Sequence, residues 1–401
     1  MDKGDDEYLW IIFVVSALIF LLGVLEKRRH QKNVDSIPVR VNINGIRGKS
    51  TVTRLITGIL IEAGYKTVGK TTGTDARMIY WNTKEESPIV RRPEGPNIGE
   101  QRRVIKEVSD LEADALVSEC MAVNPEYQII FQEDMLQASI GVIVNVLEDH
   151  MDVMGPTLDD IAEAFLATIP HNGHVIVNES RYIEFFRKEA EKRNTKLIVA
   201  DNSRISDEFL RSFEYMVFPD NASLALAVAE ALDIDEITAF RGMLNAPPDP
   251  GAMKILPLIS TSQPGYFVNG FAANDASSTI NIWKRVEELG YPTDDAAIIM
   301  NCRPDRVDRT IQFANDVLPH IKVKDVFLIG ETTQPIVRAY NEGKIPSENL
   351  HNLEGYTTDE IVDELESTLH GRVVYGVGNI HGAAGPLIER LETFKVKQLV
   401  S

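Results

Sequence analysis

The chain opens with one long apolar stretch. Residues 9–25 read Leu-Trp-Ile-Ile-Phe-Val-Val-Ser-Ala-Leu-Ile-Phe-Leu-Leu-Gly-Val-Leu, without a charge. At a rise of about 1.5 Å per residue, a helix of this length just spans the hydrocarbon core of a bilayer. The pattern predicts a transmembrane helix over about residues 8–25, within an anchor region that spans residues 1–33 and includes a basic juxtamembrane segment.

The charges that flank this stretch predict its orientation. Acidic residues precede it and basic residues follow it, namely Lys27, Arg28, Arg29 and Lys32. A cleaved signal peptide has a basic start and a small-residue cleavage site, and neither is present. The positive-inside rule places the amino terminus outside and everything after Lys27 in the cytoplasm. A buried core helix is the alternative interpretation of this stretch. Because no other uncharged stretch approaches this length, we predict a cell-membrane protein with a single transmembrane helix.

Beyond the anchor, strand and helix patterns alternate. Residues 39–43 form a short apolar run typical of a buried strand, and apolar residues recur at helical spacing over 50–63 after a loop at 44–48. The same two patterns continue to residue 232. Strands are predicted at 115–118, 140–146, 175–178 and 197–200, and helices at 99–110, 158–168, 182–192 and 222–232. This alternation predicts a parallel sheet with helices on both faces.

A proline-rich segment divides the chain. Residues 245–251 read Asn-Ala-Pro-Pro-Asp-Pro-Gly, which no helix tolerates. The alternation then restarts, with strands expected at 266–269, 297–301, 326–329 and 373–377. We therefore predict an α/β protein with a central domain over 34–248 and a smaller C-terminal α/β domain over 249–401.

Composition narrows the class of protein. The chain has 401 residues, with 41 Lys and Arg against 60 Asp and Glu, for a net charge of −19. Such acidity argues against general nucleic-acid binding, which needs a basic face. Two cysteines exclude a four-cysteine zinc site and favour a reducing compartment.

The loop between the first strand and the first helix of the body resembles a phosphate-binding loop. Its glycines let backbone N–H groups turn toward a phosphate, and the following helix adds its positive dipole end. The lysine can reach the β- and γ-phosphates of a nucleotide, and the serine hydroxyl can bind Mg²⁺. The full Walker A pattern needs glycine at position 43, where Ile43 stands, so a chance glycine-rich turn is the alternative. The candidate ATP-binding residues are Gly45, Ile46, Arg47, Gly48, Lys49, Ser50 and Thr51.

Two further side chains lie near the ends of predicted strands. Glu119 follows the strand 115–118, and His150 comes soon after the strand 140–146. Each alone is more often a structural hydrogen-bonding residue. Open α/β sheets bind ligands at the carboxyl ends of their strands, so together with Ser50 they predict a metal site. An Asn-Lys-x-Asp segment for guanine recognition is absent, which argues against a GTPase.

The order of these motifs resembles the Mur ligase superfamily. Gly-x-x-Gly-Lys-Ser-Thr is followed by a strand that ends in Glu119 and then by Asn-Val-x-x-Asp-His-x-Asp at 145–152. Asn97 is similar to the asparagine of the family's Asn-Ile-Gly segment near the transferred phosphate. Residues 271–277 are similar to the stretch whose asparagine, here Asn274, contacts adenine. The resemblance assigns ribose and phosphate contacts to Asp305, Arg306 and Arg303, and a Rossmann-like fold to the C-terminal domain.

Over nearly its whole length the chain resembles the ligase subunits of bacterial poly-γ-glutamate synthases. The supporting features are the single N-terminal anchor, the phosphate loop, Thr-Thr-Gly-Thr-Asp-Ala-Arg at 71–77 and Gly-Val-Gly-Asn-Ile-His-Gly at 376–382. One departure concerns a second metal. Many Mur ligases carry a carbamylated lysine after the motif histidine, and no lysine lies between His150 and Arg187. Either one metal suffices, or Asp149 or Asp152 holds the second.

The resemblance implies ATP-dependent amide formation through an acyl phosphate. Its cofactors would be ATP and Mg²⁺, with Lys49, Glu119, His150 and Asn97 as catalytic residues and Ser50, Glu119 and His150 as metal ligands. Its partners would be glutamate, the growing poly-γ-glutamate chain, other membrane subunits of a synthase and export complex, and further copies of the chain in a homo-oligomer. A membrane-tethered P-loop ATPase that acts as a switch or as an assembly or export factor is the competing hypothesis.

A polyglutamate substrate calls for a basic groove. Arginine suits bidentate contacts with carboxylates. Surface arginines are common, so exposure without substrate contact is the alternative for each. The candidate substrate-binding residues are Thr74, Asp75, Arg77, Arg91, Arg92, Arg102 and Arg103.

Overall fold

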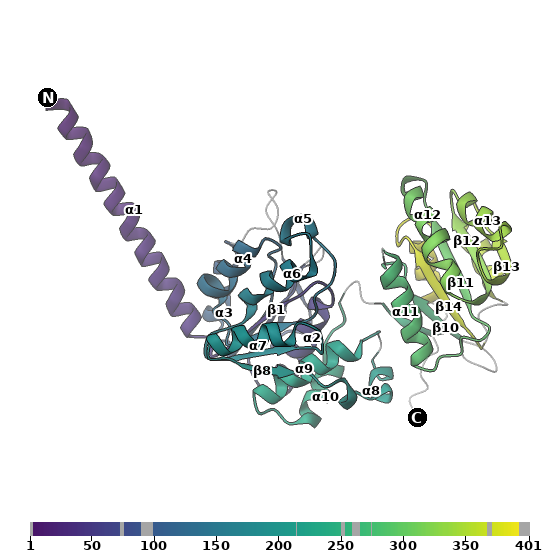
Figure 1. Cartoon of the computed structure of the whole chain (residues 1–401), viewed down its shortest axis with the longest axis horizontal. Helices are drawn as coiled ribbons and strands as arrows, with labels where there is room; N and C mark the ends of the chain where they lie inside the picture. Colours follow the sequence, from purple (N-terminus) through teal and green to yellow (C-terminus); the bar gives the residue numbers. More distant parts are fainter. Residues whose placement is uncertain are drawn as a thin grey trace. The chain divides into compact units, whose positions relative to one another are not determined.

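The computed structural model describes residues 3–72, 76–89, 99–213, 215–249, 253–258, 265–273, 275–366 and 371–392. The chain forms two compact units (Figure 1). Unit 1 comprises Met1–Ile205 with Pro219–Pro250, and unit 2 comprises Ser206–Phe218 with Gly251–Ser401.

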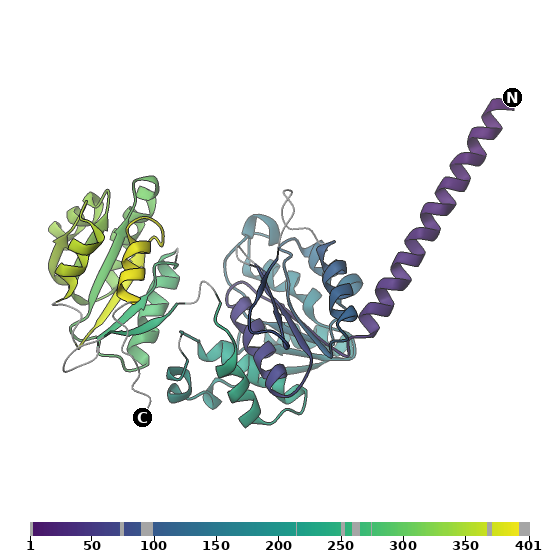
Figure 2. The ribbon, with the colours of Figure 1, turned by 180° about the vertical axis from the view of Figure 1, so that it is seen from behind.

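The amino-terminal segment is one continuous helix, α1, over Lys3–Asp35 (Figure 2). Among the helices in the described part of the chain, it is the one long and apolar enough to cross a membrane. Most of its apolar side chains from Trp10 to Leu25 are exposed, whereas Val34 near its end is fully buried. The helix therefore continues about ten residues beyond the predicted span and ends inside unit 1.

Unit 1 is built on a mainly parallel sheet, as the strand-helix alternation predicts. In the described residues the sheet has eight strands in the order β4-β3-β2-β5-β1-β6-β7-β8, and only the β2–β3 and β3–β4 pairs are antiparallel. The central order β2-β5-β1-β6 places the ends of four strands along one edge. The strands are β1 Val39–Asn44, β2 Thr67–Lys70, β3 Arg77–Tyr80, β4 Ser87–Pro88, β5 Ala115–Glu119, β6 Ile140–Ile143, β7 His174–Val177 and β8 Lys196–Val199.

Helices cover this sheet and bury two apolar clusters. One cluster holds α1 and α3 against the strands through residues such as Val34, Val104 and Leu116. The other includes Phe165 of α6 and Phe186 of α7. The helices of unit 1 beyond α1 are α2 Lys49–Glu62, α3 Glu100–Asp110, α4 Pro125–Ile129, α5 Met151–Met154, α6 Leu158–Phe165, α7 Ile183–Lys192, α9 Pro219–Ala231 and α10 Glu236–Asn245, with a π-helix over Ile130–Leu136.

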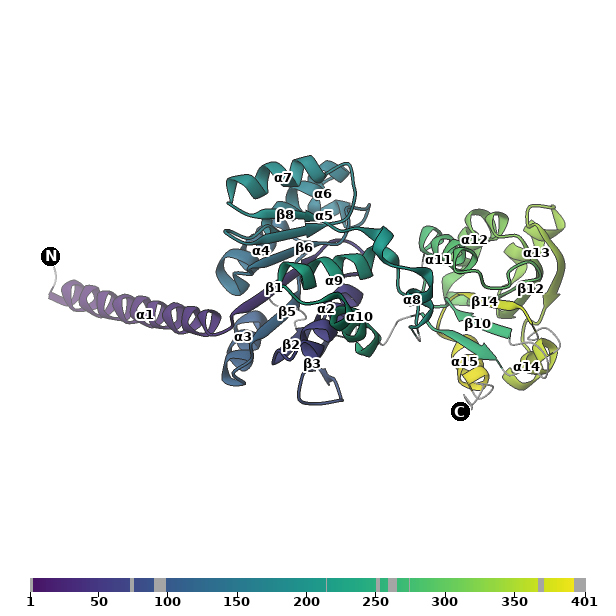
Figure 3. The ribbon, with the colours of Figure 1, turned by 90° about the horizontal axis from the view of Figure 1, so that it is seen from below.

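Unit 2 is a second α/β unit around a smaller sheet (Figure 3). Within the described residues its six strands follow the order β13-β12-β11-β14-β10-β9, and β9 alone pairs antiparallel. Its strands are β9 Ile255–Leu258, β10 Gly265–Asn269, β11 Ala297–Cys302, β12 Val323–Gly330, β13 Ser347–Asn352 and β14 Val373–Gly378. Its helices are α8 Asp207–Arg211, α11 Ala276–Glu288, α12 Val307–Asp316, α13 Gln334–Asn341, α14 Thr358–Glu366 and α15 Ala384–Glu392.

The segment Ser206–Phe218, which contains α8, packs with unit 2 although it precedes α9 of unit 1 in the sequence. Arg285 Nη2 lies 2.9 Å from Asp207 Oδ1, and Arg211 Nη1 donates to the Leu289 carbonyl oxygen at 2.9 Å. The chain therefore crosses from one unit to the other more than once, and the proline-rich segment is only one of these crossings.

The helix that follows the phosphate loop packs very closely on α10. A Cβ at Gly242 would lie 2.5 Å from the Ile59 Cα, and one at Gly58 would lie 2.3 Å from the Gly242 carbonyl oxygen. The buried Arg54 of α2 pairs with Glu86, and its Nη1 donates to the Pro247 carbonyl oxygen at 3.3 Å. Helix α2 thus fixes the point at which the proline-rich segment leaves α10.

This close contact leaves no room for a methyl group. Overpacking of this kind costs about 1–3 kcal/mol, so Gly242→Ala is expected to lower the free energy of unfolding of unit 1 by that amount. Thermal and denaturant unfolding of the detergent-solubilised chain measures the change. Gly385→Ala is the matched control, because a Cβ there meets open space. An unchanged unfolding transition for Gly242→Ala would contradict the close contact of α2 and α10.

Candidate active site

The loop between β1 and α2 has a backbone that only glycine adopts easily. Gly45 has a φ of 132° and Gly48 a φ of 84°. A Cβ at Gly45 would lie 3.0 Å from the Asn145 backbone nitrogen, and one at Gly48 would lie 2.8 Å from Asn221 Oδ1. Both conformation and space therefore require glycine at the two positions.

Asn145 holds this loop in place. Its Oδ1 accepts hydrogen bonds from the backbone N–H groups of Ile46 at 3.1 Å and Arg47 at 3.0 Å. Its Nδ2 donates to the Arg47 carbonyl oxygen at 2.9 Å. The motif at 145–152 contains Asn145, but its spacing alone does not show that the side chain bonds to the loop about a hundred residues earlier.

Lys49 lies at the start of α2 and folds back over the loop. Its Nζ donates to the carbonyl oxygens of Gly45 at 2.8 Å and Ile46 at 3.2 Å. The ammonium group is therefore held at the loop together with the first N–H groups of the helix. This combination of a lysine and a helix N-terminus suits an anionic phosphate.

The structure brings Ser50 and Glu119 into direct contact. Ser50 Oγ donates to Glu119 Oε2 at 2.9 Å, and the backbone N–H of Thr72 donates to the same oxygen at 2.9 Å. Glu119 is buried at the end of β5, which lies beside β1. A serine hydroxyl and a carboxylate are oxygen ligands of the kind that hard divalent cations prefer.

His150 lies in the left-handed region, with a φ of 51°, just before α5. Its backbone N–H donates to Asp149 Oδ1 at 2.9 Å, and Asp149 Oδ2 lies 3.3 Å from Arg47 Nη2. The histidine is thereby connected to the loop through Asp149 and Arg47. Over the described residues, no group of three or more His, Cys, Asp and Glu side chains has the spacing of a metal site.

A second lysine, which the sequence patterns did not single out, lies at the same edge of the sheet. Lys70 is the last residue of β2, pairs in register with Ser118 and is buried, with 1% of its surface exposed. Its Nζ lies 3.6 Å from Glu100 Oε1 at the start of α3. The strand Thr67–Lys70 was not predicted, and without it nothing in the sequence indicates that Lys70 ends a strand beside Glu119.

Cys120 follows Glu119 and serves as a packing residue. Burial raises the pKa of its thiol to about 11, against the lowering influence of Lys49 and Lys70. The thiol is therefore protonated at neutral pH and is a poor nucleophile.

The candidate substrate-binding arginines lie in different surroundings. The backbone N–H of Arg77, at the start of β3, donates to Thr71 Oγ1 at 3.0 Å. Arg102 Nη1 lies 2.8 Å from Glu26 Oε1 of α1, and Arg103 is exposed on α3. The other candidates, Thr74, Asp75, Arg91 and Arg92, lie outside the described residues, as do Asn97 and Asn274.

In unit 2, two of the remaining candidates, Arg303 and Asp305, line a pocket at the carboxyl ends of β11 and β12. The pocket measures about 420 Å³ and includes Arg303, Asp305 and Glu331. Arg303 Nη2 lies 2.7 Å from Asp305 Oδ2. Arg306 is the last residue of the short 3₁₀ helix Pro304–Arg306, which contains Asp305.

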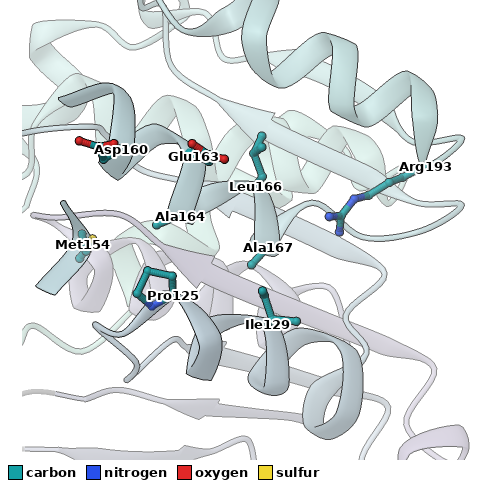
Figure 4. Close-up of a pocket in the computed structure, with 9 residues that line it drawn as sticks. All are labelled: Pro125, Ile129, Met154, Asp160, Glu163, Ala164, Leu166, Ala167 and Arg193. Atoms are coloured by element: carbon teal, nitrogen blue, oxygen red, sulfur yellow. The ribbon is translucent and has the colours of Figure 1, made fainter. Parts of the chain in front are cut away.

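A second pocket, in unit 1, measures about 400 Å³ (Figure 4). Ile129 and Ala167 contribute apolar walls, and Asp160, Glu163 and Arg193 contribute charged groups. None of the residues predicted to bind ATP, metal or substrate lines this pocket.

Comparison with known proteins identifies the family of the chain. Residues 43–237 match the Mur ligase middle domain, and residues 255–394 match the poly-gamma-glutamate synthase CapB C-terminal domain. The PGA synthase CapB of Bacillus subtilis (strain 168) is 73% identical over 393 residues, which cover 98% of this chain and 100% of that protein. The capsule biosynthesis protein CapB of Bacillus anthracis is 66% identical over 389 residues, or 97% of this chain and 84% of that protein.

Solved structures show the same fold at much lower identity. A bifunctional folylpolyglutamate synthase/dihydrofolate synthase from Yersinia pestis, complexed with AMPPNP and a Mn ion, aligns with a TM-score of 0.58 at 11% identity. The alignment covers 91% of this chain and 92% of that chain. This likeness and the two mainly parallel sheets confirm the α/β, Mur ligase-like fold predicted from the motifs. With 73% identity over almost its full length, the chain belongs to the CapB family of poly-γ-glutamate synthases, which has a Mur ligase middle domain.

Proposed function

We propose that the chain is a membrane-anchored, ATP-dependent amide ligase that polymerises glutamate through its γ-carboxylate and forms an acyl phosphate on the way. The observation that carries the proposal is the hydrogen bond of Ser50 to Glu119 beside a phosphate loop whose backbone conformation requires Gly45 and Gly48. The relatives named PGA synthase and capsule biosynthesis protein supply the substrate class.

The residues at the loop fit a nucleotide with a divalent cation. Gly45 and Gly48 themselves add no side chain to the loop, and Ser50 and Glu119 present oxygen atoms 2.9 Å from each other. We propose Mg²⁺ as the cation, with His150 as a further ligand. When bound, the ion neutralises phosphate charge and polarises the transferred phosphoryl group.

The side chains of unit 1 orient the reactants and offset negative charge. Lys49 would leave the Gly45 and Ile46 carbonyl oxygens and contact the β- and γ-phosphates. The ammonium group of Lys70 would lie near the attacking carboxylate, because it ends the strand next to the one that carries Glu119. Two cations at this edge would lower the repulsion between a carboxylate and a phosphate, the main obstacle to acyl phosphate formation.

Other residues would complete the site. In unit 2, Asp305 would bond the ribose, Arg303 or Arg306 would contact phosphate, and Asn274 would contact adenine. In unit 1, Asn97 would lie near the transferred phosphate. Arg77 and the other candidate arginines would bind the carboxylates of the growing polymer.

The cellular setting follows from α1. We propose that α1 spans the cell membrane with the amino terminus outside and both units in the cytoplasm. A single helix provides no pore for a long polyanion, so other membrane subunits would complete the export path, and the chain itself would form a homo-oligomer.

Substrate dependence separates a ligase from a P-loop switch. ATP, Mg²⁺ and L- or D-glutamate are supplied to the membrane-embedded chain, and ADP and amide product are measured. The ligase account expects ADP release that depends on glutamate and matches amide formation. Turnover independent of glutamate, with no amide product, would reject it.

Removal of the Lys49 ammonium is expected to stop the reaction. Lys49→Ala should lower polymer formation by at least about 10³-fold, since a charge contact with the reacting phosphate is lost. Membrane insertion should be unchanged. Polymer yield equal to that of the parent chain would refute the assignment of the phosphate loop.

The role of Lys70 is tested by a neutral side chain of similar length. Lys70→Met is expected to lower kcat by about 10²-fold, the effect of one charge-stabilising group. ADP release by the membrane-embedded chain gives kcat, and thermal unfolding checks that the fold persists. Glu100→Gln is the matched control, because it removes the lysine's partner but keeps the lysine, and it should retain most of the activity. A full-rate Lys70→Met enzyme would exclude the proposed role.

A further inference from the structure

Helix α1 does not end where its apolar stretch ends. Its last turns dock on unit 1, where His30 Nε2 lies 3.0 Å from the Met135 carbonyl oxygen. The side-chain amides of Gln31 and Gln137 donate to each other, at 2.9 Å in both directions. Val34 is fully buried in the cluster that includes α3 and the sheet. The apolar stretch therefore has no flexible linker between it and the catalytic unit.

Helices α1 and α3 pack against each other, and two pairs of side chains between them show that they run in the same direction. At one end, Arg102 Nη1 lies 2.8 Å from Glu26 Oε1. At the other end, the hydroxyl groups of Ser36 and Ser109 lie 2.8 Å apart. The earlier residue of α1 pairs with the earlier residue of α3, and the later with the later, so the two helices are parallel. The two pairs also fix how far along α3 each residue of α1 lies.

The topology of the sheet places these two ends. Helix α3 starts beside the carboxyl end of β2, because Glu100 meets Lys70, and it leads to the amino end of β5 at Ala115. Helix α1 likewise leads to the amino end of β1 at Val39. Arg102 and its partner Glu26 therefore lie toward the edge of the sheet that carries the phosphate loop.

Simple lengths bring that edge to the membrane. Leu25 is the last residue of the apolar stretch, and the ten residues from there to Asp35 span about 15 Å in a helix. A five-residue strand such as β5 spans about 16 Å. The part of α1 beyond its apolar stretch is thus about as long as the sheet is high. With α1 along the bilayer normal, the phosphate-loop edge would lie at the level of the lipid headgroups.

The charges at this level have the sign that an anionic surface attracts. In a chain with a net charge of −19, Lys27, Arg28 and Arg29 are consecutive and exposed, and only Glu26 separates them from the apolar stretch. Arg103 is exposed in the first turns of α3. Basic residues beside a transmembrane helix are drawn to the anionic lipids of the cytoplasmic leaflet.

We propose that α1 is a rigid strut that holds the phosphate-loop edge of unit 1 against the anionic cytoplasmic face of the membrane. The partner surface is a bilayer that contains anionic phospholipid. This inference rests on the proposed membrane anchoring and adds an orientation to it. The polymer is then made at the membrane surface, where membrane subunits can receive it without release into the cytoplasm.

A fluorescent label at either of two positions along α3 tests the orientation. Arg103→Cys places a label in the first turns of α3, and Leu111→Cys places one just past its end, about 12 Å away along the helix. Cys120 and Cys302 are buried, which directs the label to the new thiol. The full chain is embedded in nanodiscs that contain phosphatidylglycerol, with a nitroxide quencher on a fraction of the lipid headgroups.

The strut predicts at least twofold stronger quenching at position 103 than at position 111. A flexible Gly-Ser insertion of eight residues after Leu25 should abolish that contrast while the chain stays in the disc. Discs of phosphatidylcholine alone should weaken the contrast, and so should the Lys27→Gln, Arg28→Gln, Arg29→Gln variant in phosphatidylglycerol discs.

Each contrary result overturns a distinct statement. Equal or reversed quenching in an embedded chain refutes the strut and leaves the anchoring intact. An identical contrast in neutral and anionic discs refutes the headgroup contact. Failure of the chain to enter discs refutes the anchoring itself, and the orientation with it, but not the ligase activity, which glutamate-dependent ADP release measures separately.

Discussion

The constraint on which the site depends is the backbone of the turn between β1 and α2. Gly45 and Gly48 take up conformations that side chains disfavour, and Asn145 bonds both N–H groups between them. A turn held in this way fixes the start of α2 and the direction of the first N–H groups of that helix. Lys49, Ser50 and, through Ser50, Glu119 are all positioned relative to this turn.

The same turn connects the chemistry to the rest of the chain. Helix α2 begins at the turn, packs against α10 without room for a methyl group and bonds the proline-rich segment through Arg54. On the other side, the carboxylate of Glu119 accepts a hydrogen bond from the backbone N–H of Thr72, just after β2. Lys70, the last residue of β2, pairs with Glu100 of α3. Helix α3 in turn pairs with α1. The phosphate loop, the linker and the apolar helix therefore belong to one packed body.

Much of this architecture could be predicted from local patterns. The alternation of apolar runs and helical spacings identified most of the parallel strands and most helices, because each pattern depends on residues close in sequence. The strand Thr67–Lys70 is too short to show an alternation of apolar and polar residues, so the position of Lys70 at its end was not predicted either. Asn145 stood in the quoted motif, but its role rests on a contact with residues about a hundred positions away, which no spacing reveals. The apolar stretch predicted the part of α1 over residues 8–25, whereas the docked end of the helix depends on tertiary contacts such as that of His30 with Met135.

The central claim is that this phosphate loop drives the activation of a carboxylate. The most direct measurement follows oxygen from glutamate labelled with ¹⁸O in its γ-carboxylate during ATP-dependent polymerisation. An acyl phosphate transfers one carboxylate oxygen to the released phosphate, so the account predicts ¹⁸O in inorganic phosphate, in equal amount to the amide bonds formed, and none with Lys49→Ala. Polymer formation with unlabelled phosphate would contradict it.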